Sequence, residues 1–199
     1  AYSAMKKQVS VDPSRLAILG HSEGGLFTCW EAEKLNPKAI VLVGTVGERM
    51  EGTLRFQIAQ SVGKAPISDE EKKKIIDSNE ETMASLIKSG VISPNVLPGL
   101  RALYNPTSLS LVRSYLTIDP TASLVEYDGR VLVMNGEKDI QVRANHDAVL
   151  LDNALASRKK GTHELFIVPN ASHCLKHVEN ESEPGFEGRI EPVALDKIS

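Results

Sequence analysis

The hydrophobic positions of this chain gather in short continuous runs separated by longer segments of mixed character. Four runs end at glycine or proline; they span residues 16–19, 39–44, 130–136 and 164–169. Uninterrupted apolar runs of this length are typical of strands buried on both faces of a parallel sheet. Residues 26–35 contain no helix breaker and end before Asn36-Pro37, where proline stops a helix. The pattern predicts an α/β fold built on a parallel sheet.

The second and third runs are separated by 85 residues that the sheet does not need. Helical signals dominate this segment: a capping box at residues 68–71, spaced apolar residues over 72–77, 80–89 and 109–116, and a terminating Gly90. We therefore predict a core made of residues 1–47 and 126–199, with a helical insertion at residues 48–125.

The strongest chemical motif stands between the first apolar run and the first helix. It reads Gly20-His21-Ser22-Glu23-Gly24, the Gly-x-Ser-x-Gly pattern of a nucleophile elbow. Gly20 and Gly24 would let neighbouring backbone come close while Ser22 is held in a strained conformation with its hydroxyl projecting outward. Strand, tight turn and helix follow in the order that this motif requires, so Ser22 is the candidate nucleophile.

A serine hydroxyl at neutral pH is a poor nucleophile and requires a histidine base that a carboxylate orients. Asp139 follows the run at 130–136, and His173 follows the run at 164–169. Both therefore belong to the carboxyl edge of the predicted sheet, where catalytic groups collect in open α/β sheets. The order Ser22, Asp139, His173 along the chain is that of the α/β-hydrolase triad.

These motifs make the chain similar to the carboxyl-terminal two thirds of an α/β-hydrolase of the serine carboxylesterase type. Residues 18–25, 131–139 and 169–173 carry the resemblance, which covers about residues 9–46 and 128–178. It implies that Ser22 is the nucleophile, His173 the general base and acid, Asp139 the orienting acid, and the backbone N–H of Glu23 one oxyanion-hole donor. It also implies helices on both faces of the sheet and a helical cap formed by the insertion.

The family's second oxyanion-hole donor lies on a loop far upstream of the elbow, yet only 21 residues precede Ser22 here. We therefore expect an α/β-hydrolase fold that lacks its first strands. The elbow strand would then present unpaired N–H and C=O groups at an apolar edge, and such an edge favours a partner. We predict pairing with an amino-terminal portion of the same protein or with a second copy, as a homodimer.

Other residues compete for each role. Glu137 is a second acid near Asp139, which could instead cap a helix over residues 140–157. His177 is the rival of His173 and is expected one turn into a helix. We expect structural roles for the remaining histidines: His21 in the elbow, His146 on a helix surface and His163 at the start of a strand.

Cysteine and metal chemistry are not favoured by the sequence. Cys29 falls in the helix behind the elbow and is predicted to be core, while Cys174 lacks the context of an elbow. His173 and His177 stand four residues apart without the glutamate of a zinc-protease motif. We expect no metal and no cofactor.

Composition agrees with one soluble domain: 199 residues, 41% hydrophobic, 25% charged and a net charge of −3. This charge gives no reason to expect nucleic acid or an anionic membrane as partner. No apolar run reaches the roughly 18 residues of a membrane span, and the amino-terminal end lacks the apolar core of a signal peptide. Because the chain starts at Ala1 without methionine, we expect processed or truncated ends and leave the compartment open between cytoplasm and secretion.

The predicted activity is that of a carboxylesterase-type serine hydrolase (EC 3.1.1) that cleaves a small-molecule ester through an acyl-enzyme. A peptidase of the prolyl-oligopeptidase kind shares the elbow and the triad order and is the rival within enzymes; a thioesterase and an acyltransferase are further alternatives. A non-catalytic dimerisation domain that keeps the hydrolase scaffold is the alternative outside enzymes.

Overall fold

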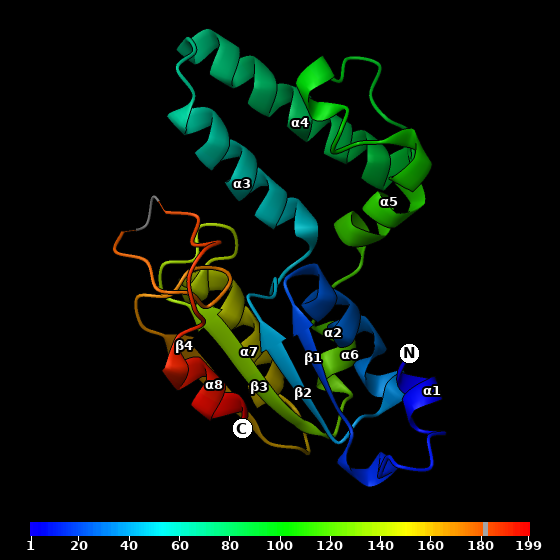
Figure 1. Ribbon diagram of the computed structural model, residues 1–199. Coiled ribbons are helices and arrows are strands. Elements are labelled where there is room, and N and C mark those ends of the chain that lie inside the picture. The colour runs from blue at the N-terminus through cyan, green and yellow to red at the C-terminus, as the bar shows by residue number, and fades with distance from the viewer. Residues whose placement is uncertain (181–182) are drawn as a thin grey trace. The chain divides into compact units, whose positions relative to one another are not determined.

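The computed structural model describes residues 1–180 and 183–199, and the chain divides into two compact units. The first comprises Ala1–Glu48 and Pro120–Ser199, and the second comprises Arg49–Asp119 (Figure 1). Among the described residues, no helix combines the length and the apolar character needed to cross a membrane.

The first unit is built on a sheet of four parallel strands in the order β1-β2-β3-β4. Their bounds are β1 Ala17–His21, β2 Ala39–Val43, β3 Arg130–Gly136 and β4 His163–Val168. Ile18 lies opposite Ile40, and Ile40 lies opposite Val131. Each apolar run forms the strand that it predicts, with ends shifted by at most two residues, and the parallel α/β class is confirmed.

Helices cover both faces of this sheet (Figure 1). Side chains along each strand point alternately to the two faces, and apolar side chains on both faces pack against helices. One face holds Ile40 and Leu42, which pack with α2 (Glu23–Leu35), α6 (Ala122–Val125) and α7 (Val149–Ala156). The other face holds Val43, Met134 and Val168, which pack with Ala194 of α8 (Pro192–Ile198). The expected two-sided arrangement is confirmed.

Short elements complete the first unit. They are α1 (Tyr2–Met5), a 3₁₀ turn at Pro13–Arg15 and a π-helical turn at Ala144–Ala148 directly before α7. The expectation of one helix over residues 140–157 is wrong in its first part. Asp139 accepts hydrogen bonds from the N–H groups of Gln141 (2.8 Å) and Val142 (3.0 Å), and these bonds hold the segment as a loop.

The second unit is helical, as the sequence predicts. It contains α3 (Met50–Lys64), α4 (Asp69–Ser89), α5 (Leu109–Thr117) and 3₁₀ turns at Pro98–Leu100 and Pro106–Ser108. Its own core includes Met83, Leu86 and Leu116. The buried Tyr104 hydroxyl donates to Asn79 Oδ1 at 2.7 Å within the same unit.

α4 is one helix of 21 residues where the apolar spacing indicates two segments. The capping box starts it as expected: Ser68 Oγ accepts from the Glu71 N–H, and Glu71 Oε2 accepts from the Ser68 N–H. The polar residue Ser78 at the middle of α4 does not interrupt the helix. Ser78 is buried, and its Oγ has a hydrogen-bond partner because it accepts from the Leu97 N–H. The helix ends at Gly90 in the left-handed conformation (φ 72°).

Candidate active site

Ser22 occupies the turn between β1 and α2 with φ 53° and ψ −120°, a combination that side chains other than glycine rarely adopt. Its N–H donates to the carbonyl of Val43 at 2.8 Å, which fixes the turn to the end of β2. The structure therefore gives Ser22 the strained strand-to-helix position that the motif predicts.

Close packing of α2 against the sheet explains two glycines around this turn. A Cβ on Gly20 would lie 2.5 Å from the carbonyl oxygen of Gly24 and 2.5 Å from Thr28 Oγ1. A Cβ on Gly25 would lie 1.8 Å from Thr45 Oγ1. Gly24 is different: a Cβ there would meet nothing within 4 Å, so the expectation that Gly24 permits a close approach is wrong. Gly24 faces outward in the first turn of α2, and Gly25 takes the crowded position.

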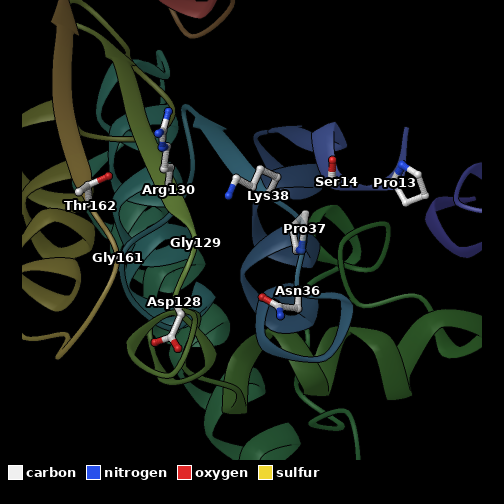
Figure 2. Close-up of a pocket in the computed structure, with 10 residues that line it drawn as sticks. All are labelled: Pro13, Ser14, Asn36, Pro37, Lys38, Asp128, Gly129, Arg130, Gly161 and Thr162. Carbon is white, nitrogen blue, oxygen red and sulfur yellow. The ribbon is translucent and has the colours of Figure 1, made fainter. Parts of the chain in front are cut away.

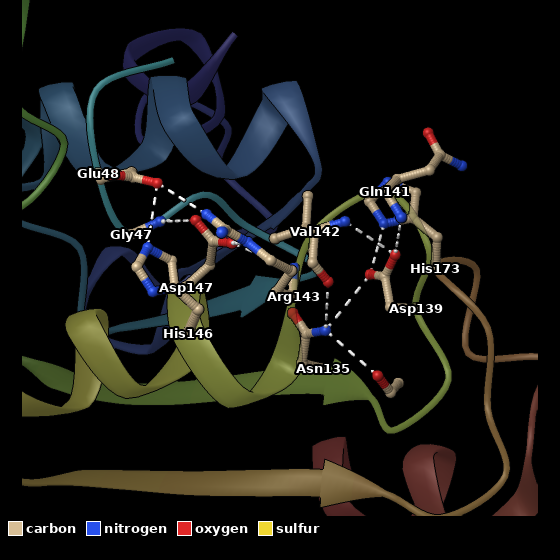
Figure 3. A network of polar contacts seen from close by, with 11 residues as sticks. Gly47, Glu48, Asn135, Asp139, Gln141, Val142, Arg143, His146, Asp147 and His173 are labelled. Atoms are coloured by element: carbon tan, nitrogen blue, oxygen red, sulfur yellow. Dashed lines mark hydrogen bonds and ion pairs between the residues drawn. The ribbon is translucent and has the colours of Figure 1, made fainter. Parts of the chain in front are cut away.

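His173 and Asp139 form a buried pair at the carboxyl edge of the sheet (Figure 3). His173 Nδ1 lies 2.7 Å from Asp139 Oδ2, and the two residues are only 4% and 8% exposed. An ionised carboxylate only accepts hydrogen bonds, so Nδ1 is the donor. In the neutral imidazole, Nε2 then keeps its lone pair and can accept a proton.

The Asp139 carboxylate is held from several sides. Besides His173, Oδ2 accepts from Asn135 Nδ2 at 3.3 Å, and Oδ1 accepts from the N–H groups of Gln141 and Val142 (Figure 3). Asn135 is completely buried in β3 and also donates to the carbonyl of Val142 at 3.1 Å. Asn135 was not among the candidates predicted from the sequence, although a polar side chain inside a buried apolar strand is a recognisable signal.

The two competing residues lie elsewhere. Glu137 Oε2 accepts from the N–H of Asn170 at 2.9 Å and so stabilises the turn after β4. His177 is exposed and lies in an antiparallel bridge with Ala171, so the expected helix around it is wrong. The backbone turns back at Leu175, which has φ 56°, and this prevents a helical turn.

His177 also differs from His173 in its ionisation. Hydrogen bonds to the carboxylates of Glu191 (2.8 Å) and Glu179 (3.1 Å) raise the pKa of His177 above its usual range. A raised pKa favours the charged form of the ring, and the charged form has no free lone pair with which to accept a proton. Of the two histidines after β4, His173 has the environment of a general base.

The end of β2 lies between Ser22 and the His173–Asp139 pair. Gly44, directly after Val43, has φ 53°, and a Cβ there would lie 2.9 Å from His173 Nδ1. The elbow turn and the His173–Asp139 pair therefore both lie against the end of β2. Gly44 was not singled out from the sequence, although a glycine directly after a strand is a recognisable signal.

The other predicted positions are as follows. Cys29 is fully buried, and burial raises the pKa of its thiol well above the usual range, in agreement with a core residue. Cys174 is half-buried. Glu23, the candidate oxyanion-hole residue, is the first residue of α2, where the positive end of the helix dipole favours an anion.

Glu48, His146 and Asp147 offer ligand atoms within 4.8 Å of one another (Figure 3). Arg143 already supplies a positive charge to this cluster, because its guanidinium lies 2.8 Å from Glu48 Oε1 and 3.4 Å from Asp147 Oδ2. The buried Asp147 also accepts from the N–H of Gly47 at 3.2 Å. We therefore interpret the group as an ion-pair network that fixes the loop after β2 to the start of α7.

A cavity of about 510 Å³ lies at the opposite edge of the sheet (Figure 2). Its lining includes Ser14, Lys38, Arg130 and Thr162, which stand at or before the amino ends of the strands. Ser22, Asp139 and His173 are at the carboxyl ends, so this cavity is not part of the candidate active site.

Comparison with solved structures identifies the fold. An acylaminoacyl peptidase in complex with Z-Gly-Gly-Phe-chloromethyl ketone aligns with a TM-score of 0.51 and 14% identity, over 90% of this chain and 23% of that one. Est1E from Butyrivibrio proteoclasticus aligns with a TM-score of 0.50 and 17% identity, over 88% and 58%. The chain has an α/β-hydrolase-like fold. Within the described residues, the fold lacks its first strands and its sheet begins at the strand that carries the elbow.

Acetyl xylan esterase 1 from Thermoanaerobacterium sp. JW/SL YS485 aligns less closely, with a TM-score of 0.49 and 13% identity over 86% of this chain and 44% of that one. The chain therefore spans less than two thirds of each of these three proteins. No protein-family model and no curated protein matches the sequence.

Proposed function

We propose that the protein is a serine hydrolase that cleaves carboxylic esters through an acyl-enzyme. The observation that carries the proposal is the strained Ser22 at the elbow together with the buried His173–Asp139 pair, whose 2.7 Å bond leaves His173 Nε2 as an acceptor. All three residues lie at the carboxyl edge of one sheet, where α/β folds place catalytic groups.

In the proposed reaction, His173 Nε2 accepts the proton of the Ser22 hydroxyl while Oγ attacks the ester carbonyl. The backbone N–H of Glu23 donates to the oxyanion of the tetrahedral intermediate, near the amino end of α2. His173 then protonates the leaving alkoxide. In the second half, His173 deprotonates a water molecule that attacks the acyl carbonyl, and it then returns this proton to Ser22 Oγ as the bond to the acyl group breaks.

Asp139 remains ionised during this cycle and stabilises the charge that forms on His173. Its two oxygens accept four hydrogen bonds in all, from His173, Asn135, Gln141 and Val142. These bonds fix the direction of the carboxylate. A carboxylate fixed in this way holds the imidazole in the orientation and tautomer that a general base needs.

The test compares wild type with Ser22→Ala on p-nitrophenyl acetate, butyrate and octanoate, after circular dichroism has shown that both are folded. We expect the variant to lose turnover by about 10⁴-fold or more. Equal rates in the two proteins, or no turnover in either, would remove Ser22 as a working nucleophile and favour the non-catalytic scaffold.

The same preparation separates ester hydrolysis from the related activities. A peptidyl p-nitroanilide reports a prolyl-oligopeptidase-like peptidase, an acyl-CoA reports a thioesterase, and added alcohol acceptors report an acyltransferase. The proposal predicts that the oxygen esters have the highest kcat/KM. A higher value on the anilide or the thioester would keep the triad and overturn the ester assignment.

A further inference from the structure

His21 makes a direct contact with the candidate base. Its Nε2 lies 3.0 Å from the main-chain carbonyl oxygen of His173, and the two imidazole rings are 4.8 Å apart between centroids. His21 is the last residue of β1 and directly precedes Ser22. The contact therefore joins the strand that carries the nucleophile to the loop that carries the base.

The chemistry of this contact defines the tautomer of His21. A carbonyl oxygen only accepts hydrogen bonds, so Nε2 of His21 must carry the proton and donate it. This is the opposite arrangement to His173, where Nδ1 carries the proton and donates to Asp139. The two neighbouring histidines thus have different tautomers, because a different ring nitrogen of each one faces an oxygen acceptor.

We propose that His21 is a positioning residue for His173, an inference that rests on the proposed function. Asp139 restrains the ring of His173 at Nδ1, while His21 restrains the main chain of the same residue at its carbonyl. With both restraints, a displacement of the His173 loop relative to β1 breaks a hydrogen bond. The His21 bond thereby keeps Nε2 of His173 in register with Ser22.

A packing role does not account for His21. Its side chain is exposed at the end of an edge strand, outside the hydrophobic core clusters. Removing the exposed ring leaves no buried cavity, and the hydrogen bond that it takes away is the one to the carbonyl of His173. The fold should therefore tolerate substitution of His21, and the effect of a substitution should appear in the reaction.

The experiment compares wild type, His21→Ala and His21→Gln. The glutamine side chain also carries N–H donors and reaches a similar distance, so it can restore the bond to the carbonyl. His163→Ala is the matched control, because His163 is the first residue of β4 at the opposite edge of the sheet. Two quantities are measured: the rate at which diisopropyl fluorophosphate modifies Ser22, by mass spectrometry, and kcat and KM for p-nitrophenyl butyrate.

We expect His21→Ala to slow modification and to lower kcat by about 10- to 100-fold with KM unchanged, as small misplacements of catalytic groups do. His21→Gln should recover most of this loss, and His163→Ala should behave like wild type. A reactive wild type with an equally reactive His21→Ala variant would overturn the positioning role and leave the proposed function standing. Failure of glutamine to recover the rate would assign the effect to the ring itself and also overturn it.

A measurement that needs no activity separates the two levels of inference. Nitrogen-15 NMR of the histidine rings should report the Nε2–H tautomer for His21 in wild type and in Ser22→Ala. An Nδ1–H tautomer would overturn the bond whatever the activity. If wild type has the Nε2–H tautomer of His21 but shows no reaction, the hydrogen bond from His21 exists and the proposed function is wrong. In that case the bond has no role in catalysis.

Discussion

The two histidines that follow β4 show how strongly the surroundings of a residue decide its chemistry. His173 is buried, with Nδ1 on the carboxylate of Asp139, and His177 is exposed between two glutamates. They stand only four positions apart in the chain. Their spacing gives no preference, but their surroundings differ: His173 pairs with one buried carboxylate, whereas hydrogen bonds to two glutamates raise the pKa of His177.

Replacing each histidine should separate these roles. His173→Ala should abolish ester turnover by about 10⁴-fold or more, because the proton of Ser22 then has no acceptor. His177→Ala should retain turnover within about twofold, since its ring makes contacts only to surface carboxylates among the described residues. Initial rates on p-nitrophenyl butyrate measure both. A larger loss for His177→Ala than for His173→Ala would reverse the assignment.

His177 also predicts a pH dependence of stability. Glu191 and Glu179 raise the pKa of His177 in the folded protein, so the folded state holds this proton more tightly than the unfolded state. The resulting stabilisation is fully present below the unfolded pKa of about 6.5 and is lost as the pH rises through the raised folded pKa. Urea unfolding of wild type and His177→Gln should therefore differ more at about pH 6 than at about pH 9. A difference that grows toward alkaline pH would contradict this sign.

At the scale of elements, the strands and α2 were predictable because their signals are local. Each strand is a continuous apolar run that ends at a turn residue, and α2 ends at Asn36 in the left-handed conformation before proline. The misassigned segments are held by particular hydrogen bonds and backbone angles that the pattern of apolar positions does not show. Asp139 holds the loop before α7, and a backbone reversal at Leu175 replaces the helix expected around His177.

The packing of α2 on β1 predicts opposite effects for two glycines of the elbow. Gly20→Ala should lower the free energy of unfolding by about 1–3 kcal/mol, because its Cβ would overlap the backbone of the first turn of α2. Gly24→Ala should raise the free energy of unfolding by about 0.5–1 kcal/mol, since the position is helical and open. Chemical denaturation of the two variants measures this. Equal destabilisation by both would show that the turn itself, rather than the approach of α2, demands glycine.

At the scale of the whole molecule, β1 is an edge strand. It pairs with β2 on one side, and no strand lies on its other side among residues 1–180 and 183–199. Leu19, in the middle of β1, is 53% exposed. An exposed edge with an apolar side chain is a template for pairing with another strand.

We propose that β1 pairs with a strand from a second copy of the chain. The isolated chain should then be dimeric by light scattering, and its β1 amide protons should exchange slowly with deuterium. Leu19→Lys should weaken the association, because charged residues on an edge strand oppose pairing. Val149→Lys is the matched control at another exposed apolar residue, outside the strands. A monomer with rapidly exchanging β1 amides would contradict the proposal.

The features with local signals can be predicted from the sequence alone. These are the parallel α/β class, the elbow at Ser22, the helical insertion with its capping box, and Asp139 and His173 as candidates at one edge. Each of these features is encoded within a few residues, as a run of apolar positions, a turn or a helix cap. The order of the three triad residues is read directly along the chain.

The tertiary structure decided which side chains meet. It selected Asp139 over Glu137 as the partner of His173, placed Asn135 on Asp139, and brought His21 to the carbonyl of a residue 152 positions away. It also assembled Glu48 with Arg143 across 95 positions. Spacing along a chain constrains neighbours within a turn or a strand, but the direction of a side chain at a sheet edge depends on which strands pair and how closely the helices approach. These contacts form only when the strands and helices pack together.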